Sequence, residues 1–344
     1  MSSPPAPDTA EIVIDPAFDP SSSPSNDSAL DSGATDVSTA SLSSTILAYR
    51  KIHGRTYHAY SSPSAAATEY WAPNDENAND QLDINHHLLS LSLDGKLFLA
   101  PIEKGKIHNV LDIGTGTGIW AIDFADAFPE AAVTGLDLSP IQPTWVPPNV
   151  RFVVDDVNNA LTYPDATFDY VHIRYMTGCV KDWTALYKEA YRVLKPGGWI
   201  EHMDCSVGLW CDDGSIPEGS VFDQWVDMFK KAGPIMGQSF FVIEGDAFVK
   251  KMEEAGFGNI KTTVVKMPVG SWPRDGKLKE IGGVNLFAMH RDVEAFALYV
   301  TTTVLKWELA EAQVFLAKIR SELKNKAYHG YTLWKAAWSQ KPSK

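Results

Sequence analysis

Cysteine, early basic residues and long apolar runs are all scarce in this chain of 344 residues. The three cysteines (Cys179, Cys205 and Cys211) are too few for a disulfide framework and lack the paired spacing of zinc ligands. Such usage is typical of a reducing compartment. No apolar run reaches the roughly 18 residues that span a bilayer, and the first residues do not form a secretory signal. We therefore expect an intracellular protein, cytoplasmic or nuclear, without a membrane span or a metal site.

Lys and Arg are absent from residues 1–45, which hold seven acidic side chains and are rich in Ser and Pro. A segment with so little apolar surface cannot offset its ordering entropy. We therefore expect a disordered acidic tail over 1–45 and a folded domain over 46–344. The net charge is −13, of which −6 falls on the domain. Because phosphate binding needs clustered Lys and Arg, direct nucleic-acid binding is not expected.

Strand-like and helix-like segments alternate from residue 107 onward. Strands are expected at 107–113, 132–137, 150–154, 168–173 and 198–203, and helices at 118–128 and 183–194. This alternation predicts a parallel, doubly wound α/β sheet with right-handed crossovers. Around it we expect helices at 81–99, 221–232 and 247–255, strands at 260–267 and 328–338, and a helical insert over about 275–325.

The segment 110–120 (VLDIGTGTGIW) is a strand that runs into three alternate glycines and then a helix. In a doubly wound sheet, ligands bind at this edge, and glycine lets the backbone approach a ligand closely. The next strand ends at Asp137, whose carboxylate can accept hydrogen bonds from both hydroxyls of a ribose. Together these features predict a cofactor that contains a ribose.

Two cofactors fit this pattern. A dinucleotide fingerprint has the spacing G-x-G-x-x-G, whereas Gly118 arrives one residue early. Asp112 stands two residues before Gly114 and would repel a pyrophosphate but attract a sulfonium or ammonium group. The pattern therefore favours S-adenosylmethionine over NAD, and an NAD-dependent oxidoreductase is the alternative.

Three further segments support this site. The third strand ends in Asp155-Asp156-Val157, where an acid can accept a hydrogen bond from the amino group of an adenine. Arg174, at the end of the fourth strand, can anchor the carboxylate of a cofactor or an acidic substrate, or form a surface ion pair. A Lys-Pro-Gly-Gly turn over 195–198 leads into the fifth strand. Each has a structural explanation alone, but their joint order and spacing indicate one cofactor site.

The order of these motifs resembles the class I S-adenosylmethionine-dependent methyltransferases over residues 105–205. The block LDIGTGTGIWAIDFA, the segment LSPIQP at 138–143 and WVPP at 145–148 are similar to the fungal LaeA-like methyltransferases, over about residues 50–340. The resemblance implies a Rossmann-like sheet of order 3-2-1-4-5-7-6 with an antiparallel last strand. The helical insert would then lie between strands six and seven. It also implies a link to fungal secondary metabolism or development, and a velvet-type regulatory protein as a partner.

Candidate cofactor-binding residues lie in the glycine turn, at the strand ends and upstream of the sheet. They are Tyr57, Asp112, Gly114, Thr115, Gly116, Gly118, Asp137, Leu138, Asp155, Asp156, Val157 and Arg174. The resemblance implies that Asp112 and the glycines surround the methionine part of the cofactor and that Asp156 and Val157 contact the adenine. It also implies that Tyr57 folds over the cofactor from the N-terminal side.

Methyl transfer from a sulfonium is an in-line displacement, and alignment supplies much of its acceleration. A general base is needed only for a protonated hydroxyl or amine acceptor. Candidate bases are His172, His202 and Asp204, although His172 alternates with Tyr170 and can equally face a covering helix. The acceptor, a small molecule or a protein, is left open. A regulatory interaction protein that retains the methyltransferase fold is the alternative function.

Overall fold

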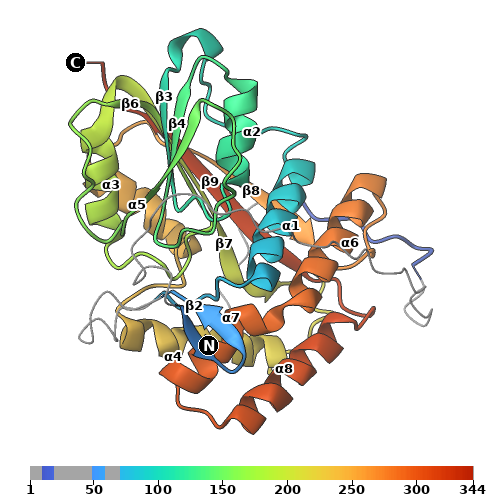
Figure 1. The fold of residues 1–344 in the computed structure, drawn as a ribbon. Helices are drawn as coiled ribbons and strands as arrows, with labels where there is room; N and C mark the ends of the chain where they lie inside the picture. Colours follow the sequence, from blue (N-terminus) through green and yellow to red (C-terminus); the bar gives the residue numbers. More distant parts are fainter. Residues whose placement is uncertain (1–9, 19–48, 59–69, 344) are drawn as a thin grey trace.

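A seven-stranded mixed sheet forms the centre of the molecule (Figure 1). The structure, a computed structural model, describes residues 10–18, 49–58 and 70–343. In sheet order the strands are β5 (Val150–Val154), β4 (Ala132–Asp137), β3 (Asn109–Ile113), β6 (Phe168–Arg174), β7 (Leu194–Trp210), β9 (Tyr331–Gln340) and β8 (Lys261–Pro268). Strand β9 is antiparallel to β7 and β8, and the other neighbouring pairs are parallel. The predicted order 3-2-1-4-5-7-6 with an antiparallel last strand is confirmed.

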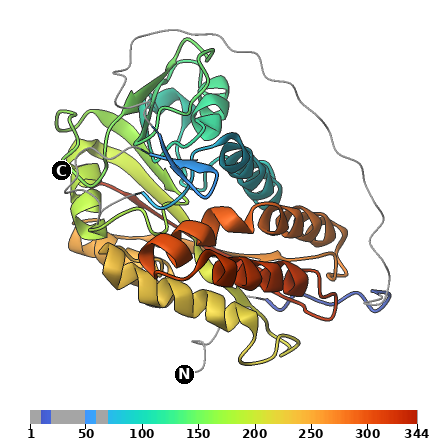
Figure 2. The same cartoon turned by 60° about the horizontal axis from the view of Figure 1, so that its bottom comes forward.

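Helices cover both faces of the sheet and its carboxyl edge. One face packs on α3 (Trp183–Val193) and α5 (Ala247–Glu254). The other packs on α1 (Glu76–Ser92), α2 (Ile119–Ala127) and α6 (Gly276–Arg291). A third layer lies across the carboxyl ends of the strands: α4 (Val221–Met236), α7 (Val293–Tyr299), the π-helical turn η4 (Val300–Val304) and α8 (Leu309–Leu323). Figure 2 shows α4, α7 and α8 side by side in this layer.

Alternation along the strands decides which side chains face which helices. In β3, Leu111 and Ile113 pack in the core beneath α3, whereas Val110 packs beneath α2. Asp112 shares the face of Val110, because side chains two residues apart point the same way. In β6 the same rule puts His172 on the face of Tyr170. The sheet therefore brings Asp112 and His172 together beneath α2.

Most element bounds lie within a few residues of the sequence predictions, and three differences have a clear structural cause or were not foreseen. Helix α1 begins at Glu76, because the Asp75 side chain caps it by accepting a hydrogen bond from the Ala78 N–H at 3.2 Å. Strand β7 begins at Leu194, before the turn expected at 195–198 and the strand expected at 198–203, because Leu194 pairs with Phe168 across a register shift. The hairpin of β1 (Arg50–Ile52) and β2 (Arg55–Tyr57) was not predicted.

Part of the expected tail contacts the domain. Ile14 forms a β-bridge with Pro273, and the Asp15 N–H donates to the Trp272 carbonyl at 2.9 Å. Asp15 also pairs with Lys279 at the start of α6. Of the predicted tail, only residues 10–18 are among the described residues. Among the described helices, none is long and apolar enough to cross a membrane.

Candidate functional site

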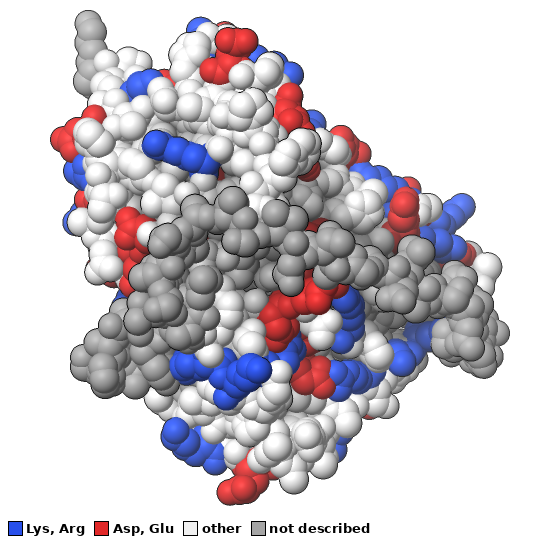
Figure 3. Space-filling model, viewed as in Figure 1, with Lys and Arg blue, Asp and Glu red and all other residues white. Residues whose placement is uncertain are grey.

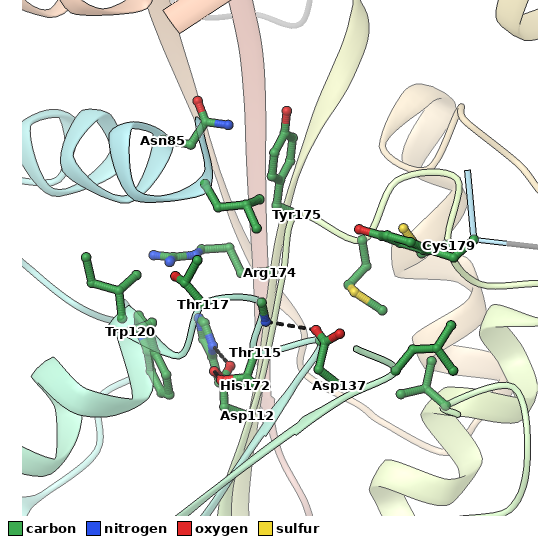
Figure 4. A pocket seen from close by; sticks show the side chains of 18 of the residues that line it. Asn85, Asp112, Thr115, Thr117, Trp120, Asp137, His172, Arg174, Tyr175 and Cys179 are labelled. Atoms are coloured by element: carbon green, nitrogen blue, oxygen red, sulfur yellow. Dashed lines mark hydrogen bonds and ion pairs between the residues drawn. The ribbon is translucent and has the colours of Figure 1, made fainter. Parts of the chain in front are cut away.

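A cavity of about 110 Å³ opens at the carboxyl ends of β3, β4 and β6, beneath α1 (Figure 4). We call it the first cavity. It brings together most of the predicted cofactor-binding residues and one candidate base. Those that line it are Asp112, Gly114, Thr115, Gly116, Asp137, Leu138, Asp155, Asp156, Val157, His172 and Arg174.

The glycine turn is held against the end of β4. Gly116 has a φ of +58°, a conformation that side chains other than glycine rarely adopt. Its N–H donates to the Asp137 carboxylate at 2.8 Å, and its carbonyl accepts from the Gln142 side chain at 2.7 Å. Gln142 also donates to the Ser139 carbonyl at 3.0 Å. The LSPIQP segment thus fixes the turn and Asp137 relative to each other.

Asp137 carries a charge in a poorly hydrated place. Burial raises its pKa to about 6, and the nearby charge of Asp112 adds to this, although N–H donation from Ser139 and Gly116 acts in the opposite direction. One carboxylate oxygen accepts from the Ser139 N–H at 2.9 Å and the other from Gly116. Each oxygen keeps a lone pair for a further donor. A pair of ribose hydroxyls would supply such donors.

Asp112 and His172 form a buried pair on the floor of the cavity. The His172 Nδ1 lies 2.7 Å from one Asp112 oxygen, and the Thr115 hydroxyl donates to the other at 2.6 Å. The His172 ring stacks on Trp120, with centroids 3.6 Å apart. Burial lowers the pKa of His172 to about 4, so the imidazole is neutral at pH 7 and its N–H donates to Asp112. Its geometry suits holding Asp112 in place.

Helix α1 closes the cavity from above, which the sequence motifs did not reveal. His86 accepts from Arg174 at 3.0 Å through Nδ1 and lies 2.9 Å from Asp123 of α2 through Nε2. The Thr117 hydroxyl of the glycine turn donates to Asp83 of α1 at 2.6 Å. The helical spacing of Leu82, Asn85, His86 and Leu89, all of which line the cavity, is the signal that could have found this face.

Two candidate bases lie on the opposite face of the sheet. His202 is fully buried under α3, where its Nδ1 lies 2.6 Å from the Tyr187 hydroxyl and its ring stacks on Trp183. Asp204 is also fully buried and accepts from the Met176 N–H at 3.0 Å. Neither residue lines the first cavity.

Two predicted cofactor residues also lie outside the cavity lining. Tyr57 is fully buried beneath the helical layer, with its ring 5.3 Å from that of Tyr299. Gly118 lies behind the turn as the N-cap of α2, with a φ of +82°. A Cβ at Gly118 would come within 2.3 Å of the Phe152 ring. Gly118 therefore serves packing between turn and strand.

A second cavity of about 170 Å³ adjoins the first and lies between the sheet edge and the helical layer. Its walls are mostly aromatic and aliphatic, and no Asp, Glu, Lys, Arg or His of the described residues lines it. Five residues line both cavities: Tyr70, Leu82, Asn85, Tyr175 and Cys179. Tyr175 directly follows β6 with a φ of +58°, a strained conformation for a bulky residue. Figure 4 shows its ring beside Asn85 at this junction.

The charge of the first cavity discriminates between the two cofactors considered above. Four carboxylates line it, from Asp112, Asp137, Asp155 and Asp156, against a single cation among the described residues, Arg174. Such a lining attracts a sulfonium and repels a pyrophosphate. In addition, the buried Gln238 side-chain oxygen, which lines this cavity, has no hydrogen-bond partner. Within the described part of the chain, no group of three or more His, Cys, Asp or Glu side chains is arranged to hold a metal ion.

Comparison with known proteins identifies relatives over most of the chain. The profile of a methyltransferase domain matches residues 84–262. Methyltransferase pytC of Aspergillus terreus is 40% identical, over 90% of this chain and 93% of that protein. Secondary metabolism regulator LAE1 of Cochliobolus heterostrophus is 34% identical, over 83% and 93%. Protein-methionine methyltransferase laeA of Emericella nidulans is 30% identical, over 86% and 77%.

The sheet topology, the glycine turn and the acidic first cavity, together with the matching family profile, define a Rossmann-like methyltransferase that uses S-adenosylmethionine, as predicted. The chain belongs to the methyltransferase-domain family and, within it, to the fungal LaeA-like group.

Proposed function

We propose that the first cavity is the S-adenosylmethionine site and that Asp137 accepts hydrogen bonds from both ribose hydroxyls. The anchoring of its carboxylate by the Gly116 and Ser139 N–H groups carries this proposal, because it leaves the remaining lone pairs facing the cavity. Asp155, Asp156 and Val157, at the end of β5, are proposed to surround the adenine.

The methionine part then lies along the Gly114–Gly116 turn. Arg174 lines the same cavity, held by His86, and is proposed to bind the carboxylate of the methionine part. His172 keeps Asp112 oriented toward the cavity and is not proposed as a base. The bound group supplies an activated methyl, and the residues of this chain position it and exclude water.

We propose further that the methyl acceptor is a small apolar molecule bound in the second cavity. An uncharged aromatic lining stabilises such a molecule by removing its apolar surface from water. A cavity of about 170 Å³ is slightly larger than the roughly 150 Å³ that holds one benzene ring, so a single-ring acceptor fits it. Tyr175, which lines both cavities, separates donor and acceptor and sets their approach.

Calorimetric titration with S-adenosylhomocysteine tests the donor site, and Ala78→Leu tests the acceptor site. Ala78 of α1 lines only the second cavity, so a larger side chain there should block the acceptor. We expect Ala78→Leu to bind S-adenosylhomocysteine like the wild type and to lose at least tenfold in kcat/KM for an apolar acceptor. The exposed Lys250→Leu on α5 is a control that should change neither. If Ala78→Leu lost affinity for S-adenosylhomocysteine as strongly as it lost kcat/KM, the proposal of two separate sites would be contradicted.

A regulatory role in secondary metabolism is the second candidate, and the names of the LaeA and LAE1 relatives, both secondary metabolism regulators, support it. A velvet-type protein is the partner proposed for this role. The two functions are compatible. Gly116→Ala separates them: we expect it to abolish donor binding and to leave partner binding intact in a pull-down with a purified velvet-type protein. Fluorescence of the tagged protein in fungal cells would decide between nucleus and cytoplasm.

A further inference from the structure

The second cavity lacks charged walls, yet two hydroxyl groups that line it are each hydrogen-bonded to a carboxylate behind them. The Thr177 hydroxyl donates to Asp204 at 2.6 Å, and the Ser206 hydroxyl donates to Glu244 at 2.7 Å. Thr177 lies just after the end of β6, and Ser206 lies in β7 where its pairing with β9 is interrupted. Each pair is a candidate route by which a proton can leave an uncharged acceptor.

The Asp204 carboxylate is surrounded by hydrogen-bond donors. Its two oxygens accept from the Met176 N–H, the Cys205 N–H and the Thr177 hydroxyl, and one oxygen lies 3.3 Å from His202. With these partners the Asp204 oxygens have little room for a further donor. Asp204 therefore fixes the segment after β6 and is not proposed as the proton acceptor.

Glu244, in contrast, has few hydrogen-bond partners and a shifted pKa. One oxygen accepts from Ser206, and the other is buried without any hydrogen-bond partner. Burial raises the pKa of Glu244, and the nearby charge of Asp204 adds to this, although the Ser206 hydroxyl and the backbone N–H groups of Ile243 and Glu244 act in the opposite direction. The ionisable groups that face it are Asp204 and the Cys205 thiol. No Lys or Arg pairs with it among the described residues.

Ser206 can relay a proton because its hydroxyl has one lone pair free. The Ser206 oxygen donates to Glu244 and accepts from the Gly208 N–H at 3.2 Å. A hydroxyl can donate once and accept twice. The remaining lone pair belongs to a side chain that lines the second cavity. An acceptor hydroxyl in this cavity can therefore donate to Ser206.

We propose that Ser206 and Glu244 together take the proton from a hydroxyl acceptor, an inference that rests on the proposed function of the second cavity. As the acceptor oxygen bonds to the methyl carbon, the bond from that carbon to the sulfonium breaks. Ser206 takes the proton of the acceptor hydroxyl and passes its own proton to Glu244. The positive charge on sulfur and the negative charge on Glu244 disappear together, so the step is balanced. The acceptor class is a single-ring phenol or alcohol.

The experiment uses the full chain, radiolabelled S-adenosylmethionine, and two uncharged probes, 4-ethylphenol and 4-ethylpyridine, at pH 8. The phenol must lose a proton, whereas the pyridine nitrogen has none to lose, so Glu244→Gln should leave the pyridine rate unchanged. We expect Glu244→Gln to lower kcat for 4-ethylphenol by roughly 100- to 10,000-fold, the usual contribution of a general base. The wild-type rate should fall as pH drops below the raised pKa of Glu244, and Glu244→Gln should lose this acidic limb. Glu244→Asp should restore part of the rate.

Three controls make the outcome decisive. Glu253→Gln changes an exposed carboxylate on the adjacent helix α5 and should behave like the wild type. S-adenosylhomocysteine affinity should be equal in all variants, and Ser206→Ala provides a second test if Glu244→Gln unfolds. A Glu244→Gln enzyme with wild-type rate and pH profile overturns the proposal. So does a wild-type enzyme that binds S-adenosylhomocysteine yet does not methylate 4-ethylphenol. If the wild-type protein did not bind S-adenosylhomocysteine at all, that result would instead contradict the proposed donor site.

Discussion

Lowering the pH should weaken the binding of S-adenosylhomocysteine through one group, Asp137. In the unliganded protein, burial raises the pKa of Asp137 to about 6. Both ribose hydroxyls can donate only to the ionised carboxylate, so the complex favours that form. With this pKa, nearly all of Asp137 is ionised at pH 7.5 and about a tenth at pH 5. The dissociation constant should therefore rise about tenfold over this range, equivalent to about 1.4 kcal/mol.

The titratable histidines at the site should not produce the same pH dependence of binding. His172, with its pKa lowered to about 4, stays neutral between pH 5 and 7.5. Burial also lowers the pKa of His86. In the unliganded protein, the raised pKa of Asp137 makes the fold lose stability as pH rises from about 4 to about 6, because the folded state holds that proton more tightly. Ligand binding should reverse this loss.

Titration calorimetry at several pH values, in two buffers with different ionisation enthalpies, measures both the affinity and the protons released. Asp137→Asn should flatten the profile. It should also weaken binding at pH 7.5 by roughly 30- to 150-fold, since two charge-assisted hydrogen bonds each lose about 1–1.5 kcal/mol. The exposed Asp126→Asn on α2 is the matched control. A flat wild-type profile, or a slope that persists in Asp137→Asn, would refute the reasoning.

Two further predictions concern the scaffold of the two cavities. Gly118→Ala should destabilise the fold by roughly 2–5 kcal/mol in urea denaturation, because its φ of +82° is strained for alanine and its Cβ would lie 2.3 Å from Phe152. Adding Phe152→Ala should recover part of the loss, and no recovery would contradict the packing argument. Arg55→Met should cost roughly 3–5 kcal/mol in thermal unfolding, because it leaves Asp75 and Asp292, each 2.6 Å from Arg55, as partly buried unpaired charges. A double-mutant cycle with Asp292→Asn that shows no coupling would contradict this.

The first cavity could be predicted from sequence because its parts are local. Gly114 and Asp155 each follow directly after a strand, Asp137 is the last residue of one, and the carboxyl ends of parallel strands meet at one edge. The place of each motif at the end of a strand therefore also predicted its place in the folded site. The face of the sheet to which a strand residue points was harder to predict. Alternation along a strand shows which residues share a face, but it does not show which helix covers that face. His172 and His202 are both strand histidines, yet they pack beneath different helices.

Helix α1 shows a second limit of the sequence. The spacing of Leu82, Asn85, His86 and Leu89 indicates an amphipathic helix but does not say what its apolar face covers. Two polar side chains of this helix contact residues far along the chain, His86 to Asp123 and Asp83 to Thr117. Such pairs have no local signature, because tertiary packing alone brings them together.

The second cavity is built in the opposite way from the first. Its lining comes from the segments 70–88, 175–179, 205–240 and 285–334, which meet only when the helical layer closes over the sheet. No segment carries a motif, and the Ser206–Glu244 pair joins residues 38 positions apart. The donor is common to all reactions of this class, so a short local pattern suffices to bind it. The acceptor differs from one enzyme to the next, and a cavity assembled from four separate segments can change its shape without disturbing the donor site.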